Sequence, residues 1–271
     1  MIIDFHTHIF PDRIADKTIK MLSEKAGFPN YLDARAESLL SSMEKAGIDK
    51  SVLLPALPAP KQFDSVNRYT LETAIASEGR LIPFGGIHPD CDDLSQKVKF
   101  LADSGFYGIK LHPDYQSTYI DDEKYVDIIT YAVKNGLVVT VHAGVDCGLP
   151  DPVHCTPERS CRMLERVFAK TQGYDAKIVL AHMGGYLMGK DVLSLLCGAS
   201  VYFDTGFTLF EKDVETTREI IEKHGADKVL FATDSPWAPQ KEYVDALKSL
   251  GLCKRDREKI LGENAAKLLN M

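Results

Sequence analysis

The stretch Gly136-Leu-Val-Val-Thr-Val-His142 contains the pattern from which the fold of this chain is predicted. A glycine follows an amphipathic segment, a short apolar run comes next, and a histidine stands at its end. Glycine suits the left-handed conformation that ends a helix. A short run rich in valine is typical of a strand buried on both faces. The stretch therefore predicts a helix-to-strand junction and a polar side chain where the strand ends.

The same pattern recurs along the chain. Glycines in the equivalent place lie 25 to 37 residues apart, at Gly47, Gly79, Gly105, Gly136, Gly173, Gly198 and Gly225. The runs that follow them, together with the apolar start, predict eight strands at 2–5, 51–54, 81–85, 107–111, 137–141, 177–181, 200–203 and 228–232. Helical periodicity lies between them, for example at 35–46, 66–77, 123–135, 157–171 and 214–224.

Eight strand–helix units predict an α/β protein with a (β/α)8 TIM-barrel fold. A length of 271 residues suits one such domain, spanning residues 1–271. An open doubly wound sheet is the structural alternative, disfavoured because no G-x-G-x-x-G motif follows the first strand. Long strand-to-helix connections at 8–33, 55–64 and 143–156 place the expected chemistry at the carboxyl ends of the strands.

The composition argues against nucleic acid and membrane as binding partners. The net charge is −7, with 32 Lys and Arg against 39 Asp and Glu, and no basic cluster predicts a nucleic-acid partner. No apolar run is long enough to span a membrane, and the start MIIDFHTHIF does not read as a signal peptide. Six cysteines without C-x-x-C spacing predict reduced thiols and a cytoplasmic location. The sequence leaves a homo-oligomer open.

Polar residues gather where the predicted strands end. Six of the eight histidines follow these runs, namely His6, His8, His88, His112, His142 and His182. Asp204 and Asp234 follow the last two runs. In a barrel, the carboxyl ends of the strands face one shared pocket, so these side chains are candidates for a single site.

The pair His6 and His8 is the strongest single indication of chemistry. One residue separates them, so in an extended strand both imidazoles leave the same face and can bind one ion. Imidazole with an added carboxylate favours Zn²⁺, with Mn²⁺, Fe²⁺ or Ni²⁺ as alternatives. Two ligands make half a site, and the remainder would come from later strand ends, where His142, His182 and Asp234 are available.

Several motifs resemble a known family. They are DFHTHIFP, IKLHP, TVHAG, AHMGG, FDTG and FATDSPW, in this order along the chain. They look like the amidohydrolase superfamily, specifically the amidohydrolase-related branch that contains aminocarboxymuconate semialdehyde decarboxylase-like enzymes beside hydrolases. The resemblance covers nearly the whole chain and is specific for the fold and the metal site.

The resemblance implies that His6, His8, His142 and Asp234 bind one divalent metal ion and that His182 acts on the substrate or the bound water. Asp234 would also be catalytic, as the group that moves the proton. Lys110 bears on the metal count, because binuclear members carry a carboxylated lysine at the end of strand four. A second metal bridged by carboxylated Lys110 is the alternative to a plain ammonium, and the mononuclear site is favoured.

Four further residues are candidates for substrate contact or for supporting the ligands. His88 and His112 each precede proline, which makes a rim position as reasonable as a substrate contact. Asp204 could fix the tautomer of a histidine or cap the following helix. Trp237, the only tryptophan, would form a wall of the pocket.

Three functions are consistent with these residues. The favoured one is a metal-dependent hydrolase in which metal-activated water attacks an amide, lactone or ester of a small molecule. The second is a metal-dependent non-oxidative decarboxylase, a carboxy-lyase acting on a small unsaturated or aromatic carboxylate. The third is a barrel that binds metal or ligand without turnover.

Overall fold

The computed structural model describes residues 1–210 and 213–271. Its eight strands form one parallel sheet in chain order from β1 to β8. The strands are β1 (Ile3–Thr7), β2 (Lys50–Leu53), β3 (Leu81–Gly86), β4 (Gly108–Leu111), β5 (Val138–Val141), β6 (Ile178–Leu180), β7 (Tyr202–Asp204) and β8 (Val229–Leu230). The predicted TIM barrel is confirmed, and the predicted strand limits differ from these by up to two residues.

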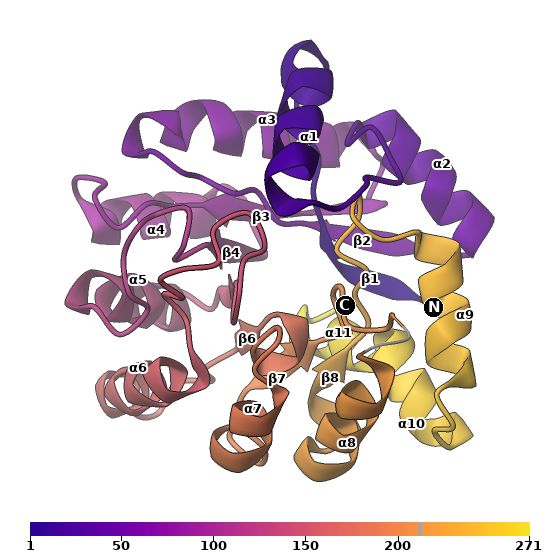
Figure 1. Ribbon diagram of the computed structural model, residues 1–271. Helices are drawn as coiled ribbons and strands as arrows, with labels where there is room; N and C mark the ends of the chain where they lie inside the picture. Colours follow the sequence, from indigo (N-terminus) through magenta and orange to yellow (C-terminus); the bar gives the residue numbers. More distant parts are fainter. Residues whose placement is uncertain (211–212) are drawn as a thin grey trace.

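Helices surround the strands in a ring (Figure 1). They are α1 (Asp12–Ala26), α2 (Ala36–Ala46), α3 (Phe63–Ala76), α4 (Leu94–Asp103), α5 (Glu123–Lys134), α6 (Pro157–Lys170), α7 (Gly189–Leu195), α8 (Val214–His224), α9 (Gln240–Ser249), α10 (Lys254–Glu258) and α11 (Asn264–Leu268). Short helical turns lie at Pro60–Gln62, His182–Gly184, Ala226–Lys228 and Lys259–Glu263. All seven glycines of the repeat have a positive φ, between 69° and 102°.

The barrel closes between β1 and the segment that follows β8. Phe5 donates its N–H to the carbonyl of Phe231 at 2.8 Å, and Asp234 donates to the carbonyl of His6 at 2.9 Å. A third bond runs from the N–H of His8 to the carbonyl of Ser235 at 2.7 Å. The first and last strands are thus joined through the residues that carry the N-terminal histidines and Asp234.

Two apolar clusters hold the layers together. The larger one joins the helices to the strands. The smaller one draws Phe5, Phe84, Val138, Val179 and Leu230 from five different strands, with α11 against it, so it fills the interior of the barrel. Because this packing occupies the barrel, the polar strand ends lie above it and are available for a site.

Candidate metal centre

A cavity of about 360 Å³ opens at the carboxyl ends of the strands. Of the residues predicted from the sequence, it is lined by His6, His8, Lys110, His112, His142, His182, Asp234 and Trp237. Asp204 is completely buried beside it, and His88 is outside its lining. The structure therefore brings eight of the ten predicted residues to one cavity.

His6, His8 and Asp234 form one of three groups of potential metal ligands among the described residues. His8 Nε2 lies 3.0 Å from Asp234 Oδ1, and His6 Nε2 lies 3.4 Å from the same oxygen. One ligand atom from each residue falls within 4.8 Å of the others. The register of β1 shifts between Asp4 and Thr7. Such an irregularity re-aims side chains at the end of a strand.

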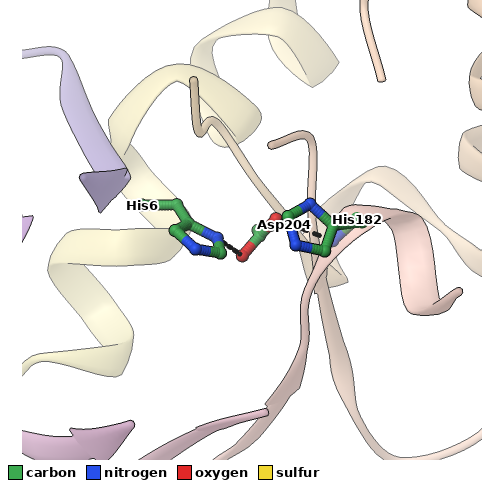
Figure 2. A group of neighbouring side chains, drawn as sticks. All are labelled: His6, His182 and Asp204. Atoms are coloured by element: carbon green, nitrogen blue, oxygen red, sulfur yellow. Dashed lines mark hydrogen bonds and ion pairs between the residues drawn. The ribbon is translucent and has the colours of Figure 1, made fainter. Parts of the chain in front are cut away.

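The other ring nitrogen of each N-terminal histidine has an acceptor. His6 Nδ1 lies 3.0 Å from Asp204 Oδ2 (Figure 2), and His8 Nδ1 lies 2.7 Å from the carbonyl oxygen of Leu54. Both Nδ1 atoms must therefore donate, so each Nε2 faces the Asp234 carboxylate either with a lone pair or with a proton that a metal ion would replace. His6 Nε2, His8 Nε2 and the Asp234 oxygen face one another, and such a group needs a shared proton or a cation between its members. The residues therefore fit a divalent metal ion.

Burial keeps this group ready to bind a cation. His6 is 1% exposed, and desolvation, reinforced by Lys110, lowers its pKa well below 6.5, so its ring is neutral. Burial acts to raise the pKa of Asp234, but the neighbouring His6 and the hydrogen bond with His8 hold it below its usual value. A neutral imidazole beside an ionised carboxylate is the donor set that zinc and similar ions prefer.

His182 is held by one bond to the last residue of β7 and one to the loop after it. Its backbone N–H donates to Asp204 Oδ1 at 3.0 Å (Figure 2), and its Nδ1 donates to the carbonyl of Gly206 at 2.9 Å. Its Nε2 therefore carries a lone pair. His182 and Asp234 both have a left-handed backbone, with φ of 56° and 66°. Such conformations are costly for residues other than glycine and concentrate at functional sites.

His142 lies next to His182 rather than inside the group of three. Its Nδ1 is 3.0 Å from His182 Nε2 and must donate, because His182 Nε2 can only accept. Its Nε2 has no hydrogen-bond partner among the described residues and lies 3.9 Å from Asp114 Oδ2. His142 belongs instead to a group with His112 and Asp146, so its role as a ligand of the first ion stays a prediction.

Lys110 reaches the centre from β4. It is 1% exposed, and its Nζ lies 3.1 Å from His6 Nε2. Burial lowers its pKa to about 8, against the opposing pull of Asp204 and Asp234. A buried amine with a lowered pKa can act as an ammonium beside a substrate anion or, when neutral, accept carbon dioxide.

Comparison with known proteins gives a family. The family model described as Amidohydrolase matches residues 3–271. The chain belongs to the amidohydrolase family. No curated protein matches it in sequence.

Solved structures similar to this amidohydrolase share its fold. They include 2,6-dihydroxybenzoate decarboxylase from Rhizobium (19% identity, TM-score 0.69, covering 99% of this chain and 98% of that one). A probable 2-pyrone-4,6-dicarboxylic acid hydrolase from Acinetobacter baumannii has 16% identity and a TM-score of 0.70, with 100% and 99% coverage. The 5-carboxyvanillate decarboxylase from Novosphingobium aromaticivorans, a D314N mutant with bound manganese, has 16% identity and a TM-score of 0.71, with 100% and 97% coverage.

His88 and His112, the two candidates for a rim position or substrate contact, each accept a backbone N–H at Nδ1. His112 stacks between Tyr115 and His142, and its Nδ1 accepts from the backbone N–H of Tyr115 at 3.4 Å. Its Nε2 therefore carries the proton and lies 3.5 Å from Asp146 Oδ2. His88 Nδ1 likewise accepts from the N–H of Asp90 at 3.0 Å.

Sequence reasoning missed two acidic residues near the centre. Asp146 lines the cavity, and burial raises its pKa. Asp114 is 3% exposed and accepts from the backbone and ring of His154, both at 3.0 Å. Both follow a strand-end histidine by two to four residues, and this spacing was the available signal.

His224 lies away from the carboxyl ends of the strands, and the cysteines form no disulfide in the described chain. His224 accepts from the N–H of Gly198 and donates to the carbonyl of Val201, which is a structural role. All six cysteines lie in described parts of the chain and none forms a disulfide. Within residues 1–210 and 213–271, no helix has both the length and the apolar character needed to cross a membrane.

Proposed function

We propose that this amidohydrolase uses one divalent metal ion, Zn²⁺ in preference to Mn²⁺, Fe²⁺ or Ni²⁺, to hydrolyse an amide, lactone or ester of a small molecule. The observation that carries the proposal is the approach of His6 Nε2 and His8 Nε2 to one oxygen of Asp234. These three residues would hold the ion. His142 is proposed as the fourth ligand, which requires its Nε2 to turn from the side of Asp114.

The ion, when bound, supplies a Lewis acid that lowers the pKa of water from about 15.7 toward 7. Asp234 holds a carboxylate at the cavity wall and is ionised at neutral pH, so it can take a proton from water and return it to a leaving group. His182 lines the cavity, with its ring fixed by the bond from its Nδ1 to Gly206, and its Nε2, which accepts from His142, becomes the second group able to hold a proton once His142 turns toward the ion.

Asp204 serves this chemistry without lining the cavity. One oxygen accepts from His6 Nδ1, and the other accepts from the N–H groups of His182 and Gly206, each at 3.0 Å. A carboxylate in this position fixes the tautomer of a ligand and raises its basicity. Asp204 therefore supports a ligand and a proposed catalytic residue together.

Decarboxylation is the second candidate, and Lys110 is the observation that favours it. Its buried amine faces the cavity beside His6 and could hold the carboxylate of an unsaturated or aromatic acid. The decarboxylases named among the similar structures support this candidate at the level of a shared fold. Carboxylation of Lys110 with a second metal is the alternative use of the same amine.

Metal analysis combined with a substrate panel tests these candidates. Protein purified without chelators is assayed for zinc, manganese, iron and nickel, and then with lactones, amides, esters and aromatic carboxylates, following acid release and carbon dioxide release separately. Hydrolysis that requires about one ion per chain supports the first proposal. Carbon dioxide release without hydrolysis replaces it with the second, and turnover unchanged after complete metal removal contradicts both.

The partner is proposed to be a small-molecule substrate. A cavity of about 360 Å³ suits such a ligand, and the net charge of −7 argues against nucleic acid. The six cysteines, none of which forms a disulfide in the described parts of the chain, support a cytoplasmic location.

A further inference from the structure

Part of the cavity lining is apolar. Its walls include Phe10, Leu22, Phe28, Leu149, Phe207 and Trp237. They come from α1, from the segments on either side of it and from the loops after β5, β7 and β8. The polar lining described above, with His6, His8 and Asp234, forms the other part of the wall. The cavity therefore has a polar region and an apolar region.

Helix α1 supplies one side of the apolar region. Figure 1 shows this helix at the top of the view, near α3. Four residues from its last two turns line the cavity, namely Met21, Leu22, Lys25 and Ala26. Lys25 is exposed, so its charge lies at the rim, in water. Leu22 and Ala26 are partly buried against the cavity.

The proposed ion and Lys110, which lies beside His6, would both act on the same anionic group, so few charges remain in the cavity for a second one. Among its described lining residues the only cations are Lys25 at the rim and Lys110 beside His6, and none is an arginine. Asp146 is 9% exposed, and its carboxylate would repel an anion placed along that wall. An anion without a partner is costly in apolar surroundings.

We propose that the substrate has a single anionic or polar group, held at the polar region, and an apolar body that packs against α1, and that dianionic substrates are rejected. The inference rests on the proposed function only in taking this cavity as the substrate site. The inner face of α1, through Leu22, is then a determinant of specificity.

Trp237 provides a readout that needs no turnover. It is the only tryptophan and lines the cavity, so its fluorescence reports ligands bound there. The probes are benzoate, 4-butylbenzoate and isophthalate, titrated into the zinc-loaded protein. We expect 4-butylbenzoate to bind about tenfold more tightly than benzoate, because its methylene groups leave water for the apolar wall. We expect isophthalate to bind about tenfold more weakly than benzoate. Isophthalate binding as tightly as benzoate overturns the inference, and so does the absence of binding by both monoanions.

A charge placed on α1 gives the sharper test. Leu22→Lys should bring isophthalate to equal or exceed benzoate in affinity, because the new ammonium pairs with the second carboxylate. Ile14→Lys is the matched control, since Ile14 lies on the same helix, is 42% exposed and does not line the cavity. If Leu22→Lys misfolds, Leu149→Lys on the loop after β5 replaces it. An equal shift in the control, or no shift in either cavity variant, overturns the role of the apolar wall.

The same titration separates this inference from the proposed function. In His6→Gln, which removes a proposed ligand, 4-butylbenzoate should keep its advantage over benzoate because that preference depends on the apolar wall. A wild-type protein that binds no metal and still prefers 4-butylbenzoate would contradict the proposed function and leave the inference standing. A metal-loaded, active protein without this preference would contradict the inference and leave the proposed function standing.

Discussion

Asp204 and His6 come from strands at opposite ends of the sequence, and Asp204 Oδ2 lies 3.0 Å from His6 Nδ1 (Figure 2). The carboxylate is completely buried and can only accept, so it determines which nitrogen of His6 carries the proton. The orientation of a proposed metal ligand on β1 thus depends on a residue almost two hundred positions later. This relationship gives the first prediction.

Asp204→Asn should weaken metal binding while leaving the barrel folded. The amide group can present its NH₂ to His6 Nδ1, which makes that nitrogen an acceptor and moves the ring proton to Nε2, the proposed ligand atom. We expect zinc affinity, measured by competition with a chromophoric chelator, to fall about tenfold to a hundredfold. Asp175→Asn on the surface is the control. Unchanged affinity in Asp204→Asn would show that Asp204 does not act on the ligand.

His182→Asn and Asp234→Asn should separate catalysis from metal binding. We expect His182→Asn to retain its metal and lose about a hundredfold or more in kcat, because it removes a proton-holding group. Asp234→Asn should lose metal and turnover together, since it removes a ligand. Metal content per chain after dialysis, together with kcat, measures both. Loss of metal from His182→Asn would mean that His182 is a ligand.

Lys110→Met should retain about one ion per chain, as in the unmodified protein, if the centre is mononuclear. Binding of a monocarboxylate such as benzoate should weaken about tenfold, because a buried cation is lost from the cavity. Metal analysis and the fluorescence titration measure the two effects. A wild-type content of two ions that depends on added bicarbonate, and falls to one in Lys110→Met, would establish the carboxylated bridge instead.

Asp4 should make the metal-free protein less stable as the pH rises. It is completely buried and accepts from Thr233 and Gln240, yet burial raises its pKa from 3.8 to about 6. The folded state then binds this proton more tightly than the unfolded state. The contribution to stability is present below pH 3.8 and is lost as the pH passes through about 6, a change of about 3 kcal/mol.

Asp4→Asn cannot titrate, so it isolates that contribution. Urea unfolding of both proteins between pH 4 and 7, in the presence of chelator, should give a difference in unfolding free energy that moves against the wild type by up to about 3 kcal/mol as the pH rises. A difference independent of pH would show that Asp4 ionises in the folded state as it does in the unfolded chain.

Gly144→Ala and Gly136→Ala should differ sharply in stability. Both glycines have a positive φ, of 86° and 74°. A Cβ at Gly144 would overlap the backbone of Tyr186, whereas one at Gly136 meets nothing within 4 Å. We expect a cost of about 1 kcal/mol at Gly136 and well above 2 kcal/mol at Gly144, measured by urea unfolding. Similar costs at both positions would contradict the packing of these two loops.

The repeat made the barrel predictable from sequence because each glycine marks a backbone conformation that other residues adopt at a cost. Gly136 and its equivalents have that conformation, and the apolar runs after them are strands. The limits of the strands were less predictable. The apolar run at β8 continues to Ala232, but the strand ends at Leu230, and the N–H of the next residue, Phe231, bonds to the carbonyl of Ile260 at 2.9 Å.

The histidine pair was predictable because a spacing of two on one strand needs no long-range information. The tautomers were not, since they depend on acceptors such as Asp204 and Leu54 that folding brings from other strands. Helix α1 was also missed, because residues 8–33 were expected as a connection. The segment contains a helix that ends at Gly27 and lines the cavity.

The bonds that close the barrel have a thermodynamic consequence. One of them joins the backbone of His6 to that of Asp234, and the side chains of these two residues are proposed to bind the same ion. Chelating that ion should therefore speed amide hydrogen exchange of His8 and Asp234 far more than that of β4 and β5 on the opposite wall. The contact between β1 and the segment after β8 would then be the part of the barrel that opens most easily, and it lies at the proposed metal centre. Metal binding would stabilise both.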